Sequence, residues 1–385
     1  MTDTMAPDTM APDTMSPETA DLLAGIRSWV EIESHTPDIE GVNALADRIT
    51  ADYAPSGAEV SRIPGTGYGD HLVVRAPWGG QTNTAGILIM SHMDTVHPKG
   101  TLDTFGFRAE GDLAFGPGIY DMKGGAYCAM RAVCDLAKTG GTPLPVTHLF
   151  VADEEIGSPT SKDLIVELGK AAKYVLVTEP AREGGKIVVA RKGAVRYEVR
   201  THGEASHAGA RHQDGRSAIR EMAHTILKFE ALTDYERGTT CNVGLISGGT
   251  GTNVVPASCW IKVDIRISDM AALEEVEAFV AALTPEDPDV RIEITGGLDR
   301  PPYERDEGID ELFNHAKAVA AEIGWELEGL KTGGGSDGNF TASHTPTLDG
   351  LGVDGKGGHT NYEQLKISSL QPRRLLMRGL LERLT

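Results

Sequence analysis

Positive charge is scarce in this sequence. Its 385 residues include 36 lysines and arginines against 56 aspartates and glutamates, which gives a net charge of −20 at pH 7. Because nucleic-acid binding depends on an excess of Lys and Arg that neutralises phosphates, this balance argues against a nucleic-acid partner. It does not identify the substrate, since a basic pocket can lie within an acidic protein.

Long apolar runs and paired cysteines are also missing. No run approaches the ~18–20 apolar residues that a membrane span requires, so we expect no membrane partner. Residues 1–15 repeat Asp-Thr-Met and have neither the basic nor the apolar region of a secretory signal. We therefore expect a disordered tail and a cytoplasmic protein. The scattered cysteines form no CxxC pair, which favours reduced thiols. They are Cys128, Cys134, Cys241 and Cys259.

The order of predicted elements indicates two domains. From residue 16 to residue 191, strand-like and helix-like patterns alternate, which predicts an α/β domain with a mainly parallel sheet. Residues 192–300 follow the order strand, helix, strand, strand, helix, strand, which is the ferredoxin-like α+β arrangement. Residues 301–385 carry a further candidate ligand. We therefore expect them to complete the first domain, with the small domain inserted.

Three short apolar runs, typical of buried parallel strands, end in residues that can bind a metal. These residues are His92 and Asp94, Glu154 and Glu155, and Glu179. In an open α/β sheet, ligands bind beyond the carboxyl ends of the strands, so we expect these side chains to share one edge. The His-x-Asp pair strengthens this expectation, because a metal-bound histidine usually has its second nitrogen oriented by a carboxylate.

Two glycine-rich segments and one acidic pair extend this candidate site. Asp121 lies in Gly-Pro-Gly-Ile-Tyr-Asp-Met-Lys-Gly-Gly, although a helix N-cap would also explain it, and His359 follows Gly-Gly. Adjacent carboxylates at Glu154 and Glu155 repel each other unless a cation compensates. Because neighbouring residues point differently, one can bind metal while the other serves as general base. Together these residues indicate metal-assisted hydrolysis.

Six motifs in order resemble the M20 metallopeptidase family, and most closely its glutamate carboxypeptidase (carboxypeptidase G) branch. They are Ser-His-Met-Asp-Thr-Val, Gly-Pro-Gly-Ile-Tyr-Asp-Met-Lys-Gly-Gly, Asp-Glu-Glu-Ile-Gly-Ser, Thr-Glu-Pro, Ala-Ser-His-Ala-Gly and Gly-Gly-Gly-Ser-Asp. The resemblance runs from about residue 21 to residue 385. It implies a catalytic zinc-hydrolase domain of residues 16–191 and 301–385, with residues 192–300 forming a dimerisation domain.

The resemblance also implies two zinc ions per subunit, for which cobalt or manganese could substitute. His92, Asp121 and Glu179 would hold one ion. Asp121, Glu155 and His359 would hold the other, with Asp121 bridging. The family's bridging aspartate precedes a cis peptide, which corresponds here to the bond between Asp121 and Met122.

Three further residues receive catalytic roles from the resemblance. Glu154 would be the general base, and Asp94 would orient His92. His207, in Ala-Ser-His-Ala-Gly, matches the family histidine that reaches the active site of the partner subunit. A homodimer is therefore expected. The remaining histidines have no motif and are interpreted as structural or exposed.

Candidates for substrate contact rest on weaker signals. Arg300 aligns with the arginine that grips the substrate carboxylate in carboxypeptidase G, and Arg266 matches a carboxylate-binding arginine of other M20 branches. An arginine fork suits a carboxylate bidentately. The other candidates are Asn253, Lys186, Gly334, Gly335 and Ser336.

We therefore expect an amidohydrolase that cleaves the amide before an amino acid with a free carboxylate, preferably a C-terminal glutamate. An N-acyl-amino-acid hydrolase and a dipeptidase are alternatives with the same machinery. A metal-dependent phosphoesterase is less favoured, because the chain has no P-loop and is acidic. A non-catalytic binding scaffold is a further alternative.

Overall fold

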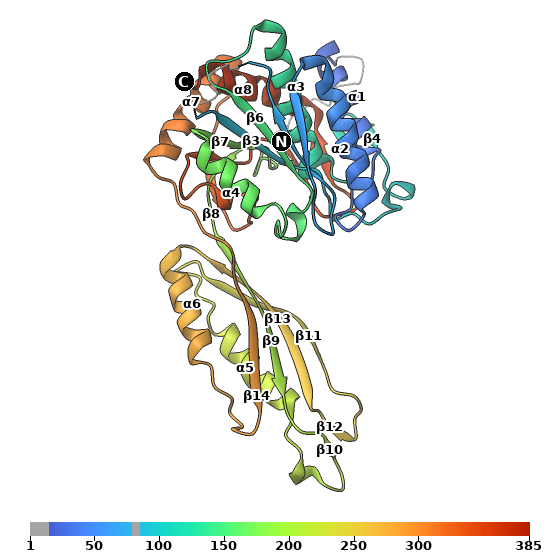
Figure 1. Ribbon diagram of the computed structural model, residues 1–385, viewed down its shortest axis with the longest axis vertical. Helices are drawn as coiled ribbons and strands as arrows, with labels where there is room; N and C mark the ends of the chain where they lie inside the picture. The colour runs from blue at the N-terminus through green and yellow to red at the C-terminus, as the bar shows by residue number, and fades with distance from the viewer. Residues whose placement is uncertain (1–14, 79–84) are drawn as a thin grey trace, which may run out of the picture. The chain divides into compact units, whose positions relative to one another are not determined.

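A computed structural model describes residues 15–78 and 85–385 of the chain. The chain divides into two compact units (Figure 1). The large unit contains the residues up to 189 together with residues 305–331 and 336–385, and the small unit contains residues 190–304 and 332–335. The predicted tail, residues 1–15, lies outside the described residues except for Met15.

The centre of the large unit is a six-stranded sheet in the order β1-β2-β6-β3-β7-β16. The strands are β1 (Glu59–Ile63), β2 (His71–Arg75), β6 (Val146–Val151), β3 (Ile87–His92), β7 (Tyr174–Val177) and β16 (Thr347–Leu348). The last four in this order run parallel, whereas β1 and β2 are antiparallel. This mainly parallel sheet confirms the predicted α/β class.

Alternate residues of β6 point to opposite faces of the sheet, and helices cover both faces. On one face, Val151 packs in a cluster with Ile165 of α4. On the other face, Phe150 meets the rings of Trp29 in α1 and Tyr53 in α2, with centroids 6.3 and 6.2 Å away. The helices are α1 (Pro17–Val30), α2 (Ile39–Tyr53), α3 (Gly124–Thr139), α4 (Lys162–Ala171), α7 (Glu307–Ile323) and α8 (Leu370–Arg383). Within the described residues, no helix is long and apolar enough to cross a membrane.

Short strands complete the large unit and its connections. An antiparallel sheet has the order β17 (Gly355–Lys356), β18 (Gln364–Lys366), β5 (Leu113–Phe115) and β4 (Arg108–Glu110). The strands β8 (Ile187–Arg191) and β15 (Gly329–Thr332) pair with each other, and each spans a boundary between the units.

The small unit has the ferredoxin-like order that its hydrophobic patterns predict. Its elements are β9 (Gly193–His202), α5 (Ala218–Glu230), β11 (Thr240–Gly248), β13 (Ser258–Ile267), α6 (Met270–Ala282) and β14 (Arg291–Arg300), with a two-stranded pair of β10 (Ser206–His207) and β12 (Val254–Val255). The antiparallel sheet has the order β11-β13-β9-β14. Ile261, Val263 and Ile265 alternate into the core, where Met222 of α5 and Val276 of α6 join them. The inserted α+β unit is thus confirmed as ferredoxin-like.

Candidate metal centre

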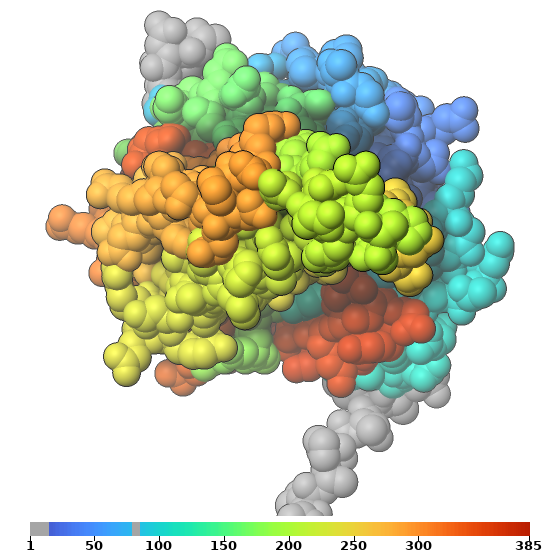
Figure 2. Space-filling view, turned by 90° about the horizontal axis from the view of Figure 1, so that it is seen from below, coloured from blue at the N-terminus to red at the C-terminus, as the bar shows by residue number. Residues whose placement is uncertain are grey.

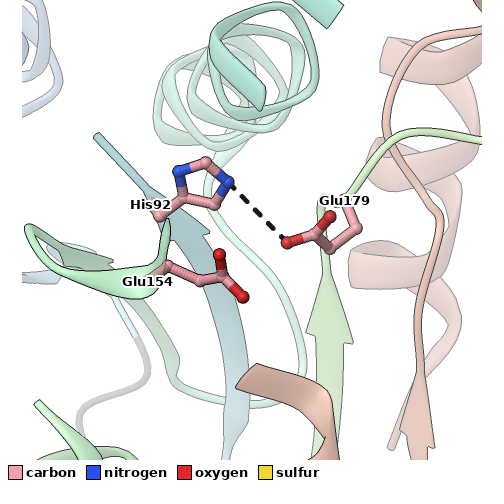
Figure 3. A group of neighbouring side chains, drawn as sticks. All are labelled: His92, Glu154 and Glu179. Atoms are coloured by element: carbon pink, nitrogen blue, oxygen red, sulfur yellow. Dashed lines mark ion pairs between the residues drawn. The ribbon is translucent and has the colours of Figure 1, made fainter. Parts of the chain in front are cut away.

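Three neighbouring parallel strands deliver candidate ligands to one edge of the sheet. His92 is the last residue of β3, Glu179 follows the end of β7 by two residues, and Glu154 opens a 3-10 helix (Glu154–Ile156) after β6. Figure 3 shows these three side chains facing one another. One metal-binding atom from each lies within 4.8 Å of the others, and His92 Nε2 is 3.8 Å from Glu179 Oε1. Strand polarity therefore explains why residues so far apart in sequence converge.

The carboxylate of Asp121 lies between two histidines. Its Oδ1 is 3.2 Å from His92 Nε2, and its Oδ2 is 3.3 Å from His359 Nε2. His359 Nε2 is also 3.1 Å from Glu155 Oε2. The peptide bond between Asp121 and Met122 is cis, as the resemblance implies. A carboxylate that faces two imidazoles in this way could bridge two metal ions.

The donors of this cluster fit zinc, which takes imidazole nitrogens and carboxylate oxygens. Oε1 of Glu155 is buried and has no hydrogen-bond partner among the described residues, although a buried carboxylate oxygen normally has one. His359 has φ of 65°, in the left-handed region that side chains rarely adopt. Such backbone strain is typical of functional sites. A bound cation would satisfy the oxygen and compensate the gathered negative charge.

The charges around the cluster shift the pKa values of its members. Hydrogen bonds from His359 to Asp121 and Glu155 raise the pKa of this histidine to about 11. Burial opposes protonation of His92, but its hydrogen bond to Asp121 and the surrounding carboxylates raise its pKa well above the usual value. Burial raises the pKa of Asp121, yet the two histidines together hold it well below the usual value. The histidine nitrogens thus face a strongly negative cluster, which attracts cations.

Asp94 is fully buried beneath this cluster and holds two backbones. Its Oδ1 accepts the backbone N–H of Glu154 at 3.2 Å, and its Oδ2 accepts that of Glu155 at 3.1 Å. Nδ1 of His92 donates to the backbone oxygen of Asp94 at 2.9 Å and lies 3.6 Å from its Oδ1. Thr36 Oγ1 donates to Oδ2 at 2.8 Å. Burial raises the pKa of Asp94 to about 7, with His92 opposing the shift.

Sequence reasoning missed Glu363, which anchors the loop that carries Asp121. Its Oε1 accepts the backbone N–H groups of Tyr120 at 2.8 Å and Asp121 at 2.9 Å. Its Oε2 accepts the N–H of Gly118 at 3.0 Å and that of His97 Nε2 at 2.6 Å. Glu363 lies in no recognisable motif, and its partners are more than 240 residues away, so no local signal points to it.

The remaining predicted residues lie elsewhere. His207 is exposed on β10, where its Nδ1 accepts the backbone N–H groups of Gly209 and Ala210, each at 3.1 Å. The segment that carries it is on the surface facing the viewer in Figure 2. Asn253 lies beside it, since its backbone oxygen accepts the N–H of Ala208 at 2.9 Å.

The two predicted arginines lie together in the small unit. A Cβ added to Gly335 would be 2.9 Å from Cδ of Arg300 and 3.9 Å from Nη1 of Arg266. Arg300 is buried, whereas Arg266 is partly exposed and already makes two hydrogen bonds to Asp264, at 2.7 and 3.0 Å. Gly334 offers its backbone oxygen to Arg191 at 3.0 Å.

Two candidates of the large unit have structural partners. Lys186 is paired with Glu328 at 2.8 Å on the surface. Ser336 is buried, caps the 3-10 helix Asp337–Phe340, and donates its hydroxyl to Asp349.

Comparison with known proteins identifies the family. Residues 88–383 match peptidase family M20/M25/M40. The chain belongs to this family. It is 35% identical over 362 residues to carboxypeptidase G2 of Pseudomonas sp. (strain RS-16). The matched region covers 90% of this chain and 85% of that protein. A succinyl-diaminopimelate desuccinylase of Cereibacter sphaeroides (strain ATCC 17025 / ATH 2.4.3) is 29% identical over 393 residues, covering 94% and 97%.

Solved structures share the fold. A tripeptidase from Staphylococcus aureus has a TM-score of 0.77 at 20% identity, covering 94% of this chain and 98% of that one. An M20 family metallo-carboxypeptidase from Sulfolobus solfataricus has a TM-score of 0.73 at 17% identity, covering 95% and 99%. The predicted M20 membership and the carboxypeptidase G-like branch are confirmed. The chain is a metal-dependent M20 peptidase that hydrolyses peptide or amide bonds.

Proposed function

We propose that this M20 enzyme is a di-zinc carboxypeptidase that hydrolyses the amide bond before a free-carboxylate amino acid, with C-terminal glutamate preferred. The observation that carries the proposal is the Asp121 carboxylate between His92 and His359, beside the unpartnered buried oxygen of Glu155. The likeness to carboxypeptidase G2 supports the carboxypeptidase reaction.

His92, Asp121 and Glu179 would hold one zinc ion, and Asp121, Glu155 and His359 the other. Zinc, when bound, lowers the pKa of a water molecule towards neutrality and polarises a carbonyl oxygen. The protein's own contribution is to hold the ligands at the strand ends and to place the proton acceptor beside them.

Glu154 is the proposed proton carrier. It faces His92 and Glu179 from the 3-10 helix after β6, and Asp94 fixes its backbone through the N–H. In hydrolysis Glu154 would accept a proton from the attacking water and return it to the leaving nitrogen, which is the task of a general base and then a general acid. Asp94 would hold Glu154, Glu155 and His92 in fixed positions relative to one another.

Arginines of the small unit are proposed to bind the substrate carboxylate. Arg300 is buried at the end of β14, and Arg266 lies near it beside Gly335. A guanidinium binds a carboxylate through two parallel hydrogen bonds, which would select substrates with a free C-terminus. Arg266 would have to leave or share Asp264 to bind a substrate carboxylate. Substrate contact by Asn253, Lys186, Gly334, Gly335 and Ser336 stays a prediction.

We also propose a homodimer that brings His207 to the active site of the partner. β11 is an edge strand of the small sheet, and Leu245 and Ile246 on it are 55% and 58% exposed. Leu227 of α5, which packs beside β11, is 71% exposed. An edge strand with adjacent exposed apolar side chains favours pairing with a second copy.

A substrate panel tests this proposal. Amine release is measured from peptides that share one acyl group and end in Glu, Asp, Leu, Phe, Ala or amidated Glu, each with and without a chelator. We expect chelator-sensitive cleavage of the Glu peptide and none of its amide. If the peptide with amidated Glu is cleaved as fast as the peptide with free Glu, the proposed binding of the substrate carboxylate by arginine is contradicted. If no peptide is cleaved, the proposed substrate class is contradicted.

An N-acyl-amino-acid hydrolase is the second candidate, favoured by the likeness to the desuccinylase. The same assay with N-acetyl- and N-succinyl-amino acids separates the two. Faster turnover of an N-succinyl substrate than of any peptide would favour this second function.

A further inference from the structure

The large unit contains a polar cavity at the beginning of α8, apart from the candidate metal centre. It has a volume of about 240 Å³, and its lining includes Trp325, Asp354, Lys366, Ser368, Ser369 and Arg373. None of the residues of the candidate metal centre lines it. We propose that this cavity binds a small oxyanion, a carboxylate or a phosphate, through the guanidinium of Arg373 and the ammonium of Lys366. The inference does not rest on the proposed function.

Arg373 is the first reason. Its side chain is 2% exposed, and it donates to the backbone oxygens of Gly185 and, at 3.5 Å, of Gly350. It also lies over the ring of Trp325, 4.4 Å from the centroid. Within residues 15–78 and 85–385, its hydrogen bonds go to backbone oxygens and none goes to a carboxylate. A guanidinium has five N–H donors, so two carbonyl acceptors leave donors available at the cavity.

The net charge of the lining residues is the second reason. The carboxylate of Asp354 is already paired with Lys366, at 2.7 Å between Oδ2 and Nζ. The two cations, Lys366 and Arg373, therefore outnumber the one carboxylate and leave a net positive charge on the lining. A buried charge without a counter-ion is costly, and burial lowers the pKa of Arg373 to about 10 although Asp354 opposes the shift. An anion in the cavity would supply the missing counter-charge.

The polar donors also select the ligand. Ser368 donates its hydroxyl and its backbone N–H to Asp112, and Ser369 donates its hydroxyl to the oxygen of Lys366. The donors left for a ligand thus belong mainly to the two cations, which suits an anionic oxygen rather than a neutral alcohol or amide. Because Asp112 adds negative charge behind Ser368, an anion of low charge fits the cavity better than one of high charge.

The fluorescence of Trp325 provides a local readout. We would titrate the metal-loaded enzyme with inorganic phosphate and, separately, with acetate, using chloride at matched ionic strength as the control. A saturable change that disappears in Trp325→Phe locates binding to this cavity rather than to the metal centre. The anion that binds more tightly, phosphate or acetate, identifies whether the cavity takes a phosphate or a carboxylate group. Equal responses to chloride would mean ionic strength alone and would overturn the proposal.

Substitutions separate the cavity from other sites. Arg373→Gln and Lys366→Gln are each expected to weaken the anion about tenfold or more, since each removes a charge-assisted hydrogen bond. Arg378→Gln is the matched control, because Arg378 lies on the same helix but pairs with Glu382 on the surface. If Arg373→Gln does not fold, Lys366→Gln decides, since its side chain is 46% exposed. Unchanged affinity in Lys366→Gln would overturn the proposal.

Discussion

At the scale of single residues, buried carboxylates in the large unit hold the backbone around the metal centre. Asp94 accepts the N–H groups of Glu154 and Glu155, and Glu363 accepts those of Tyr120 and Asp121. The loops that carry Glu154, Glu155 and Asp121 are thus held by carboxylates that are not themselves proposed ligands. Groups behind a metal ligand tune its position, so these two acids are expected to influence metal binding.

Glu363→Gln tests this expectation. The amide would place an N–H₂ group against backbone donors, so we expect the loop of Asp121 to shift and the affinity for zinc to fall about 10–100-fold. Competition with a chromophoric chelator measures the affinity. Glu382→Gln, on the exposed end of α8, is the control. A variant with lowered thermal stability but unchanged zinc affinity would show that Glu363 has only a structural role.

Glu154→Gln tests the general base. We expect both metals to remain bound while kcat falls about 10²–10⁴-fold, because the amide cannot accept the proton. Metal content and turnover are measured on the same sample. Glu167→Gln on the exposed side of α4 serves as the control. Loss of one metal equivalent would instead make Glu154 a ligand, a role that its distance of at most 4.8 Å from the donors of His92 and Glu179 also permits.

At the scale of elements, a buried histidine connects α2 to the two central strands. His148 of β6 has its Nδ1 2.7 Å from the hydroxyl of Tyr53 and its Nε2 2.8 Å from Oγ of Ser91, which lies 2.6 Å from Oγ1 of Thr178. Ser91 and Thr178 immediately precede the proposed ligands His92 and Glu179 at the ends of β3 and β7. This chain of hydrogen bonds ties together the strands that deliver the ligands.

The same histidine predicts how stability depends on pH. Burial lowers the pKa of His148 to about 3 in the folded protein, against about 6.5 when unfolded. The contribution of the neutral His148 side chain to the free energy of unfolding is therefore intact above about pH 6.5. It is lost as the pH falls towards 3, because in this range the unfolded chain takes up the proton and the folded chain does not. Chelator-treated wild type should lose up to about 1.4 kcal/mol of unfolding free energy per pH unit more than His148→Gln. Denaturant unfolding at a series of pH values measures both. Parallel pH profiles would contradict a neutral buried imidazole.

Local patterns predicted the elements better than the contacts between them. The apolar strands were evident, and with them the edge at which His92, Glu155 and Glu179 meet, because strand polarity follows from the α/β alternation. The alternation of β13 likewise predicted which of its residues are buried. Glu363 and Arg373 were not predictable, since their roles depend on partners far away in the sequence. Whether Arg300 binds a carboxylate is equally undetermined by local sequence.

At the scale of the whole molecule, the proposed dimer has a specific kinetic signature. If His207 acts in the partner's site, His207→Ala and Glu154→Gln homodimers are both inactive, but a heterodimer has one complete site. Random mixing of the two then restores roughly a quarter of wild-type activity, since half of the dimers are mixed and each has one intact site. Activity after unfolding and co-refolding measures this. No recovery, with heterodimers verified by mass spectrometry, would contradict action in trans.

The exposed apolar side chains of β11 and α5 predict the interface itself. Leu227→Arg combined with Ile246→Arg should give folded monomers with little activity, because two charges would be buried at the interface. Sedimentation and circular dichroism measure the two properties. Met270→Arg, at an exposed apolar position on α6, is the control and should remain dimeric. A double variant that stays dimeric would place the interface elsewhere.

The large unit is discontinuous, because the chain leaves it after residue 189 and returns only at residue 305. Several parts of the large unit follow the insertion in the sequence. They are β16 at the sheet edge, His359, Glu363 and α8. During synthesis, the ribosome therefore releases residues 190–304, nearly all of the small unit, while the large unit still lacks an edge strand and the proposed ligand His359. Since domains generally fold as units, residues 190–304 are expected to fold early, and the proposed two-metal site cannot be completed before His359 emerges.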